Sequence, residues 1–342
     1  MRFEYYHEGL GDVPKLSVDG TVPNSLHFSH WQGNQTPGVV KADTSTEIAL
    51  NLISHSARRE LTQGIELVTN NHFDTDGVLS VWTMLNAESA PALRDGLIAA
   101  AEAGDFSEYS TEAGIRASIV IQGSDQVAAG EETGSPLANH LAGERVLDEA
   151  RAYALVLPLV ERVITRTGDY EPLWRDPWRR IEAAVESFER AASSVVEFAD
   201  ARLSLVTLSP ELFGPEGFDP VRHAVPFTAI SRYARGQVFL IAARAGDGWS
   251  YRVDYPYYSW AETLVRPRIS RRDFAALIKR LNELERGAKG RWQKDTGELS
   301  SAFKFMDQTG TPSVSSLTPE RVAEEMRAAL VATETAALAG AQ

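Results

Sequence analysis

The sequence predicts an α/β fold: a mostly parallel sheet with flanking helices, a helical connector, and a smaller C-terminal α+β domain. Three observations support this prediction. Up to about residue 110, short apolar segments alternate with helical periodicity; residues 112–205 are dominated by helical periodicity; and β-rich segments between turn residues follow. With 342 residues, 43% of them hydrophobic, the chain is long enough for two domains that each have a core. We therefore expect two domains, residues 1–200 and 201–342.

In the first domain, strands are expected where aliphatic and β-branched residues lie between turn residues, and helices where apolar residues recur every three or four positions. This pattern predicts strands at 15–18, 25–28 and 65–68, and helices at 44–53, 78–85, 90–103, 147–167 and 178–201. Thr44 or Ser45 can cap the first of these helices, and Gly104 is expected to end the helix at 90–103. Strands that alternate with helices in this way predict a parallel sheet.

The second domain is expected to begin with strands. They are predicted at residues 203–208, 225–230, 237–242 and 249–253, where β-branched and aromatic residues lie between turn residues. A helix is predicted at 272–285, and another, rich in Ala and Glu, from Thr318 onward. This mixture of strands and helices is typical of an α+β domain.

A run of polar residues follows the strand expected at 65–68. His72, Asp74 and Asp76 alternate in this run, and a glycine opens the next helix. Alternate side chains at the end of a strand point to the same side, and open α/β sheets bind ligands at the carboxyl ends of their strands. Because the chain has no cysteine, a metal would be held by His, Asp and Glu, which suit Mn²⁺ and also Mg²⁺. We predict a divalent metal site, preferentially for Mn²⁺; the alternative is a polar loop in which Thr75 or Asp76 caps a helix.

The pattern His-x-Asp-x-Asp-Gly at residues 72–77, followed by a helix of small residues, resembles motif I of the DHH phosphoesterases. This superfamily includes exopolyphosphatases, nanoRNases and cyclic-dinucleotide phosphodiesterases, in which motif I ligates a pair of Mn²⁺ ions. The resemblance implies that His72, Asp74 and Asp76 are metal ligands and that both aspartates take part in catalysis. It also implies a second domain that binds the substrate.

A second segment, residues 28–34, resembles a degraded form of the motif Asp-His-His-x-x-Asn that names this family. His30 matches the first histidine and Asn34 matches the asparagine. Ser29 replaces the aspartate, and Trp31 replaces the second histidine. By this resemblance, His30 is a metal ligand with a catalytic role and Asn34 binds the substrate. The replacement of the aspartate leaves the bridging metal ligand unassigned.

Other parts of the chain extend the resemblance. Residues 42–48 are similar to the Ser-Ser-Thr-x-Glu helix start found downstream of this motif in the nanoRNase branch. Asp19, at the end of an expected strand, matches motif II, and Asp105, after an expected helix, resembles motif IV, which implies that both are metal ligands. The alternatives are a turn aspartate and an ordinary residue past a helix end; His27 is an alternative ligand if the register differs. Because the motifs run II, III, I, IV along the chain, the resemblance requires a permuted or rearranged strand order.

The charge distribution suggests an anionic substrate. The net charge of −13 argues against general nucleic-acid binding, yet residues 222–304 carry 16 Lys and Arg against 8 Asp and Glu. Three cations of this region are the predicted substrate-binding groups: Arg266, Arg268 and Lys304. The two arginines lie in the aromatic-rich segment 255–268, and the alternative is that they pair with acidic neighbours while the aromatics are part of a core.

Together these features predict a metal-dependent phosphoesterase, a hydrolase acting on a small anionic phosphate ester or short nucleotide. Two alternatives stay open: a metal-dependent enzyme of other chemistry on the same scaffold, and a non-catalytic binding protein derived from such an enzyme. No segment approaches 18 continuous apolar residues, and the N-terminus lacks the apolar run of a signal peptide. We therefore expect a cytoplasmic protein without a membrane partner, and a homodimer is compatible with the sequence.

Overall fold

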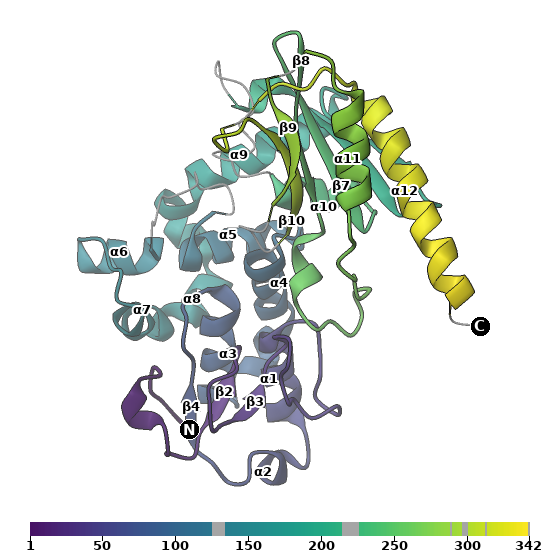
Figure 1. Cartoon of the computed structure of the whole chain (residues 1–342). Coiled ribbons are helices and arrows are strands. Elements are labelled where there is room, and N and C mark those ends of the chain that lie inside the picture. Colours follow the sequence, from purple (N-terminus) through teal and green to yellow (C-terminus); the bar gives the residue numbers. More distant parts are fainter. Residues whose placement is uncertain (125–133, 214–225, 288, 296–299, 312, 341–342) are drawn as a thin grey trace. The chain divides into compact units, whose positions relative to one another are not determined.

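The computed structural model describes residues 1–124, 134–213, 226–287, 289–295, 300–311 and 313–340, and the chain divides into two units. Unit 1 comprises Met1–Ser124, Glu132–Arg179 and Trp260–Arg268, and unit 2 contains Arg180–Ser259 and Ile269–Gln342. Each unit has its own sheet (Figure 1). Buried apolar residues also form a core in each unit. The expected α/β class is therefore confirmed.

Unit 1 is built on a parallel sheet of short strands in the order β1-β4-β2-β3 (Figure 1). The strands are β1 (Arg2–Phe3), β2 (Leu16–Val18), β3 (Leu26–Phe28) and β4 (Leu67–Thr69). Leu16 of the buried strand β2 pairs with Leu26 on one side and Val68 on the other. Strands β2, β3 and β4 confirm the three expected strands, whereas β1 is too short to produce a periodicity. Because the strands are parallel, their carboxyl ends meet at one edge of the sheet.

The helices of unit 1 pack around one apolar core that they share with the sheet. They are α1 (Ser45–Ser54), α2 (Arg58–Leu61), α3 (Thr75–Leu85), α4 (Arg94–Phe106), α5 (Glu112–Gln122), α6 (Pro136–Ala142), α7 (Glu149–Val156), α8 (Val160–Thr165) and the start of α9 (Glu171–Glu189). Thr44 caps α1 through its side-chain oxygen, as expected. Asp74, rather than Thr75 or Asp76, caps α3.

Helix α4 continues past Gly104 to Phe106, so the prediction that this glycine ends the helix is wrong. A Cβ atom at position 104 would lie 2.5 Å from Thr75 Cβ and 2.8 Å from Ser118 Oγ. Thr75 belongs to α3 and Ser118 to α5, and their hydroxyl oxygens are 3.0 Å apart. The glycine therefore lets three helices approach closely, and Asp105 lies in the last turn of α4 rather than beyond it.

Unit 2 is built on a sheet in the order β5-β6-β7-β8-β10-β9, in which only the neighbours β6 and β7 are parallel (Figure 1). The strands are β5 (Ser194–Phe198), β6 (Leu203–Leu208), β7 (Val238–Ala245), β8 (Gly248–Asp254), β9 (Arg291–Lys294) and β10 (Ser301–Met306), and the helices are α10 (Phe227–Tyr233), α11 (Ala275–Leu284) and α12 (Pro319–Gly340). The strands expected at 203–208, 237–242 and 249–253 and both expected helices are confirmed within a few residues. In the described parts of the chain, no helix combines the length and the apolar character that a bilayer crossing requires.

The prediction of one helix over residues 178–201 is wrong. Helix α9 ends at Glu189, Ala191 adopts a left-handed φ of 57°, and the chain then forms β5, which pairs antiparallel with β6. The left-handed residue turns the chain out of the helix, and the apolar residues that continue the helical spacing are strand residues. The boundary expected near residue 200 would cut this hairpin; unit 2 begins at Arg180 instead.

Two prolines account for two further differences. The strand predicted at 225–230 is wrong, because Pro226 stands at the N-cap of α10 and a helix follows; Val225 lies outside the described residues. Residues 147–167 do not form a single helix, because Pro158 lies in a 3₁₀ turn that separates α7 from α8. In both places the apolar composition is as expected, and the backbone restriction of proline decides the local structure.

We expect Gly104→Ala to lower the free energy of unfolding by about 1–3 kcal/mol, the usual cost of overfilling a packed interior. The added methyl group must displace Thr75 or Ser118, and this outweighs the ~1 kcal/mol by which alanine favours a helix over glycine. Urea unfolding measures the change. Gly168→Ala is the control, because nothing lies within 4 Å of its Cβ position. Equal stability of the two variants would contradict the role given to Gly104.

Candidate metal centre

Acidic and imidazole side chains converge at the carboxyl edge of the sheet in unit 1. They are Asp19 after β2, His30 after β3, His72 and Asp74 after β4, Asp76 in the first turn of α3, and Asp105 in the last turn of α4. Because β2, β3 and β4 are parallel strands of one sheet, residues that follow them meet at one edge. The structure thus brings together all the residues that were predicted as metal ligands.

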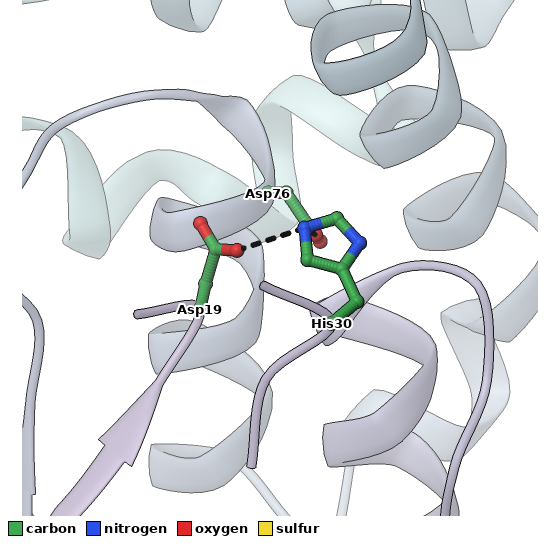
Figure 2. A group of neighbouring side chains, drawn as sticks. All are labelled: Asp19, His30 and Asp76. Atoms are coloured by element: carbon green, nitrogen blue, oxygen red, sulfur yellow. Dashed lines mark ion pairs between the residues drawn. The ribbon is translucent and has the colours of Figure 1, made fainter. Parts of the chain in front are cut away.

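One part of this centre is buried and consists of Asp19, His30 and Asp76 (Figure 2). Asp105 lies beside His30. The Nε2 atom of His30 lies 3.3 Å from Asp19 Oδ1, 3.7 Å from Asp76 Oδ2 and 3.0 Å from Asp105 Oδ2. Figure 2 shows the Asp19 carboxylate, just past the end of β2, facing the imidazole ring. The ligand atoms of Asp19, His30 and Asp76 all lie within 4.8 Å of one another, which makes them a compact donor set for a divalent cation.

The protonation of His30 also suits a metal ligand. Its Nδ1 atom lies 2.6 Å from the carbonyl oxygen of Asp43, which can only accept, so Nδ1 carries a proton. Its Nε2 atom and Asp105 Oδ2 are buried and have no hydrogen bond of ordinary geometry to any residue that the structure describes. In a neutral imidazole, Nε2 then directs a lone pair at carboxylates, which calls for a cation between them. Metal-binding histidines commonly donate their other N–H to a carbonyl in this way.

The second part of the centre is more open. His72 Nε2 lies 3.0 Å from Asp19 Oδ2 and 3.1 Å from Asp74 Oδ2. The side chains of His72 and Asp74 are each 23% exposed, whereas Asp19 is fully buried. Asp74 Oδ1 meanwhile accepts the hydrogen bond that caps α3, so one carboxylate caps the helix and also faces the centre. Solvent therefore reaches the centre from the side of His72 and Asp74.

Asp19 belongs to both parts, because its Oδ1 atom faces His30 and its Oδ2 atom faces His72. A carboxylate that offers one oxygen to each of two donor sets is suited to bridge two cations. The bridging position that the sequence left unassigned at Ser29 can thus be filled by Asp19. Ser29 instead holds the loop, since its hydroxyl oxygen accepts hydrogen bonds from the N–H groups of Gly20 and Trp31, each at 3.1 Å.

The pKa values of the two histidines reflect the negative charge around them. Burial opposes protonation of His30, but Asp105 and Asp19 outweigh it and hold the pKa of His30 well above its ordinary value. Burial likewise opposes protonation of His72, and Asp74 and Asp19 outweigh it and raise its pKa to about 12. The centre is therefore strongly attractive to positive charge, which protons or metal ions can supply.

The pKa values of the buried carboxylates also reflect the excess of negative charge in the centre. Burial and the charge of Asp19 raise the pKa of Asp76 well above its ordinary value, and burial raises the pKa of Asp105 to about 6. Burial also acts to raise the pKa of Asp19, but the nearby imidazoles of His30 and His72 outweigh it and lower this pKa. Two divalent cations would balance the four carboxylates of the centre with both imidazoles neutral, so the residues present fit a two-metal site.

Some residues that support the centre were missed by the sequence analysis. The Ser45 and Thr46 N–H groups at the start of α1 each donate to an Asp76 oxygen at 2.7 Å, which positions this carboxylate. The only signal for them is their place in the segment 42–48, which resembles a family helix start. The Tyr153 hydroxyl donates to the His72 carbonyl oxygen at 3.1 Å, and nothing in the sequence distinguishes this tyrosine from a core residue.

Arg266, a predicted substrate-binding residue, is paired with acidic side chains. It lies in unit 1, where its guanidinium contacts Asp43 Oδ2 at 2.8 Å, Glu102 Oε1 at 2.7 Å and both oxygens of Glu108. The N–H groups of residues 264–266 also donate to the Asp43 carboxylate. These contacts agree with the alternative in which the arginine pairs with acidic neighbours. Arg266 anchors the segment 260–268 to unit 1, and its guanidinium is already engaged by three carboxylates.

The other predicted substrate residues have different surroundings. The side-chain nitrogen of Asn34 donates to the Trp31 carbonyl oxygen at 2.8 Å and to Glu262 at 2.9 Å, which stabilises a turn. Arg268 is exposed in unit 1, whereas Lys304 is buried in unit 2 and lies 2.7 Å from Asp295. The alternative ligand His27 has its Nε2 atom 3.4 Å from the Val22 carbonyl oxygen and is not in either donor group.

The chain matches a model of a protein family. The model described as "Family of unknown function (DUF6687)" matches residues 2–338, which is almost the entire chain. No curated protein matches the sequence. The comparisons therefore show a family without assigning a chemistry.

We expect Arg266→Met to lower the free energy of unfolding by about 3 kcal/mol or more, since it leaves three clustered carboxylates without their shared cation. The side chain is 17% exposed, so solvent compensates only partly. Thermal unfolding measures the loss, and hydrogen exchange at Leu264 and Val265 should accelerate. Arg268→Met is the matched control and should change stability by less than about 0.5 kcal/mol. If both variants behaved alike, the anchoring role of Arg266 would be refuted.

Proposed function

We propose that this chain, which belongs to the family of unknown function DUF6687, is a metal-dependent phosphoesterase acting on a small anionic phosphate ester or short nucleotide. One observation carries the proposal: the carboxylate of Asp19 faces His30 with one oxygen and His72 with the other. Pairs of divalent ions that share a ligand are a recurrent solution for phosphoester hydrolysis, because they act on both the attacking and the leaving oxygen.

In this proposal two sets of donor residues, which share Asp19, each hold one ion. One ion would be held by Asp19, His30, Asp76 and Asp105, and the other by Asp19, His72 and Asp74. Imidazole and carboxylate donors without thiolates favour Mn²⁺ as the resident ion, with Mg²⁺ as the second choice. The bound ions would neutralise phosphate oxygens and acidify a water molecule.

The exposure of the ligand side chains indicates the side from which a substrate would approach. His72 and Asp74 are partly exposed, while Asp19, His30 and Asp76 are sealed from solvent, so the phosphate group enters from the side of His72. We propose that Asp74 orients the attacking water, because Asp74 is the partly exposed carboxylate of the centre. His30 and Asp76 act through the ion that they hold, with His30 fixed by the Asp43 carbonyl and Asp76 by the start of α1.

The resemblance to the DHH phosphoesterases supports the same proposal. Its motifs occur in the order II, III, I, IV, which would be an objection if proximity depended on chain order. Asp19, His30 and His72 follow parallel strands of one sheet, and the strand ends meet regardless of the order in which the chain forms them. The altered order is therefore compatible with the same donor set.

The ion pairs of Arg266 favour a second candidate function, a metal-dependent enzyme of other chemistry on the same scaffold. The cation predicted to hold the substrate phosphate is engaged by three carboxylates, which lowers the positive charge available for an anionic substrate. Turnover of non-phosphate substrates by the Mn²⁺-loaded protein, without turnover of phosphodiesters, would favour this candidate.

We expect the wild-type protein to retain about two equivalents of Mn²⁺ after loading and desalting, since the two donor sets share only Asp19. Asp19→Asn should retain almost none, and its turnover of bis(p-nitrophenyl) phosphate should fall at least about 100-fold. Elemental analysis and a colorimetric assay measure the two effects. Asp12→Asn, which removes an exposed carboxylate, is the control. Absence of metal from the wild type, or two retained ions in Asp19→Asn, would sink the proposal.

A further inference from the structure

Two tryptophans border the candidate metal centre in unit 1. The ring centroid of Trp31 lies 5.1 Å from that of His72 and 5.3 Å from that of Trp260. The Trp260 ring in turn lies 5.1 Å from the His30 ring, edge to face. Each histidine of the centre is therefore in contact with an indole ring, and Trp31 stands on the more open side, next to His72.

Trp31 remains 36% exposed despite its large apolar side chain. Burial of an indole is strongly favourable, so an indole left open beside a polar centre is a candidate binding surface. In the motif that residues 28–34 resemble, this position holds the second histidine, so the tryptophan gives the centre of this chain an aromatic border in place of a possible ligand.

The position of Trp31 is fixed by its neighbours. Its N–H donates to Ser29 Oγ at 3.1 Å, and the side chain of the next residue, Gln32, donates to the Trp260 carbonyl oxygen at 2.8 Å. The N–H of Glu262 donates to the His30 carbonyl oxygen at 2.7 Å. These hydrogen bonds fix the backbone that carries the two indoles, and the rings pack against each other, so a ligand that stacks on Trp31 pays little ordering entropy.

We propose, on the premise of the phosphoesterase function above, that Trp31 is a stacking platform for a planar aromatic group joined to the substrate phosphate. The substrate class is then a nucleotide, whose base lies one sugar away from its phosphate, rather than a polyphosphate or a sugar phosphate. The base stacks on Trp31 while the phosphate enters beside His72. Stacking accepts any base, because each has a π-face, so the site selects nucleotides without selecting a sequence.

The test compares two phosphate monoesters that differ only in the base: AMP and ribose 5-phosphate. Calorimetric titration of the Mn²⁺-loaded wild-type protein should give at least about fivefold tighter binding of AMP, the lower end of measured base–aromatic stacking. Trp31→Leu should abolish this ratio while leaving the Mn²⁺ content and the affinity for ribose 5-phosphate unchanged within about twofold, since the metal ligands are intact. Trp31→Phe should retain most of the ratio, because it keeps an aromatic face.

A matched control is Leu264→Ala, which removes an exposed apolar side chain from the segment 260–268 and should keep the full AMP preference. If Trp31 only excluded water, Trp31→Leu would weaken both ligands equally, and that result overturns the inference. Equal affinity of the wild type for both ligands also overturns it, while two bound Mn²⁺ ions and phosphodiester turnover would leave the phosphoesterase proposal standing. Failure to bind either ligand together with absence of Mn²⁺ would reject both.

Discussion

The carboxylate of Asp19 is the group on which the structure of the centre depends. It is fully buried, and it lies against His30 with one oxygen and His72 with the other. A charge removed from water is tolerated only where opposite charge and hydrogen bonds replace its hydration. The two imidazoles and the Ser45 hydroxyl, which donates at 2.9 Å, supply that replacement. Because these partners follow β3 and β4 and begin α1, one buried charge ties three elements of unit 1 to the end of β2.

Asp43 connects this centre to a distant part of the chain. Its carbonyl oxygen accepts the Nδ1 proton of His30, while its carboxylate accepts the N–H groups of residues 264–266 and the guanidinium of Arg266. The segment 260–268 therefore packs as part of unit 1 although its neighbours in sequence belong to unit 2. This arrangement also brings Trp260 against His30, so the metal centre and its aromatic border depend on the same anchor.

The concentration of buried carboxylates carries a stability cost that the packing around it must offset. Burial is the largest cause of the raised pKa values of Asp76 and Asp105, so the charged form of each carboxylate is disfavoured. The close approach of α3, α4 and α5 at Gly104 holds Asp105 within reach of His30 in spite of the cost of burying this carboxylate. Local conflict of this kind, maintained by the surrounding structure, is typical of functional sites.

The positions of β2, β3, β4, β6, β7 and β8, the start of α1 and the alternation of His72, Asp74 and Asp76 after a strand were determined by the sequence alone, because periodicity, caps and residue spacing are local properties. The tertiary structure decided what depends on residues far apart: that Asp19 stands between both histidines, and that the guanidinium of Arg266 pairs with three carboxylates. Arg266 and Asp43 are 223 positions apart, and no local pattern encodes such a pairing. The break after α9 was likewise decided by pairing between β5 and β6, which overrides a helical spacing that continues past it.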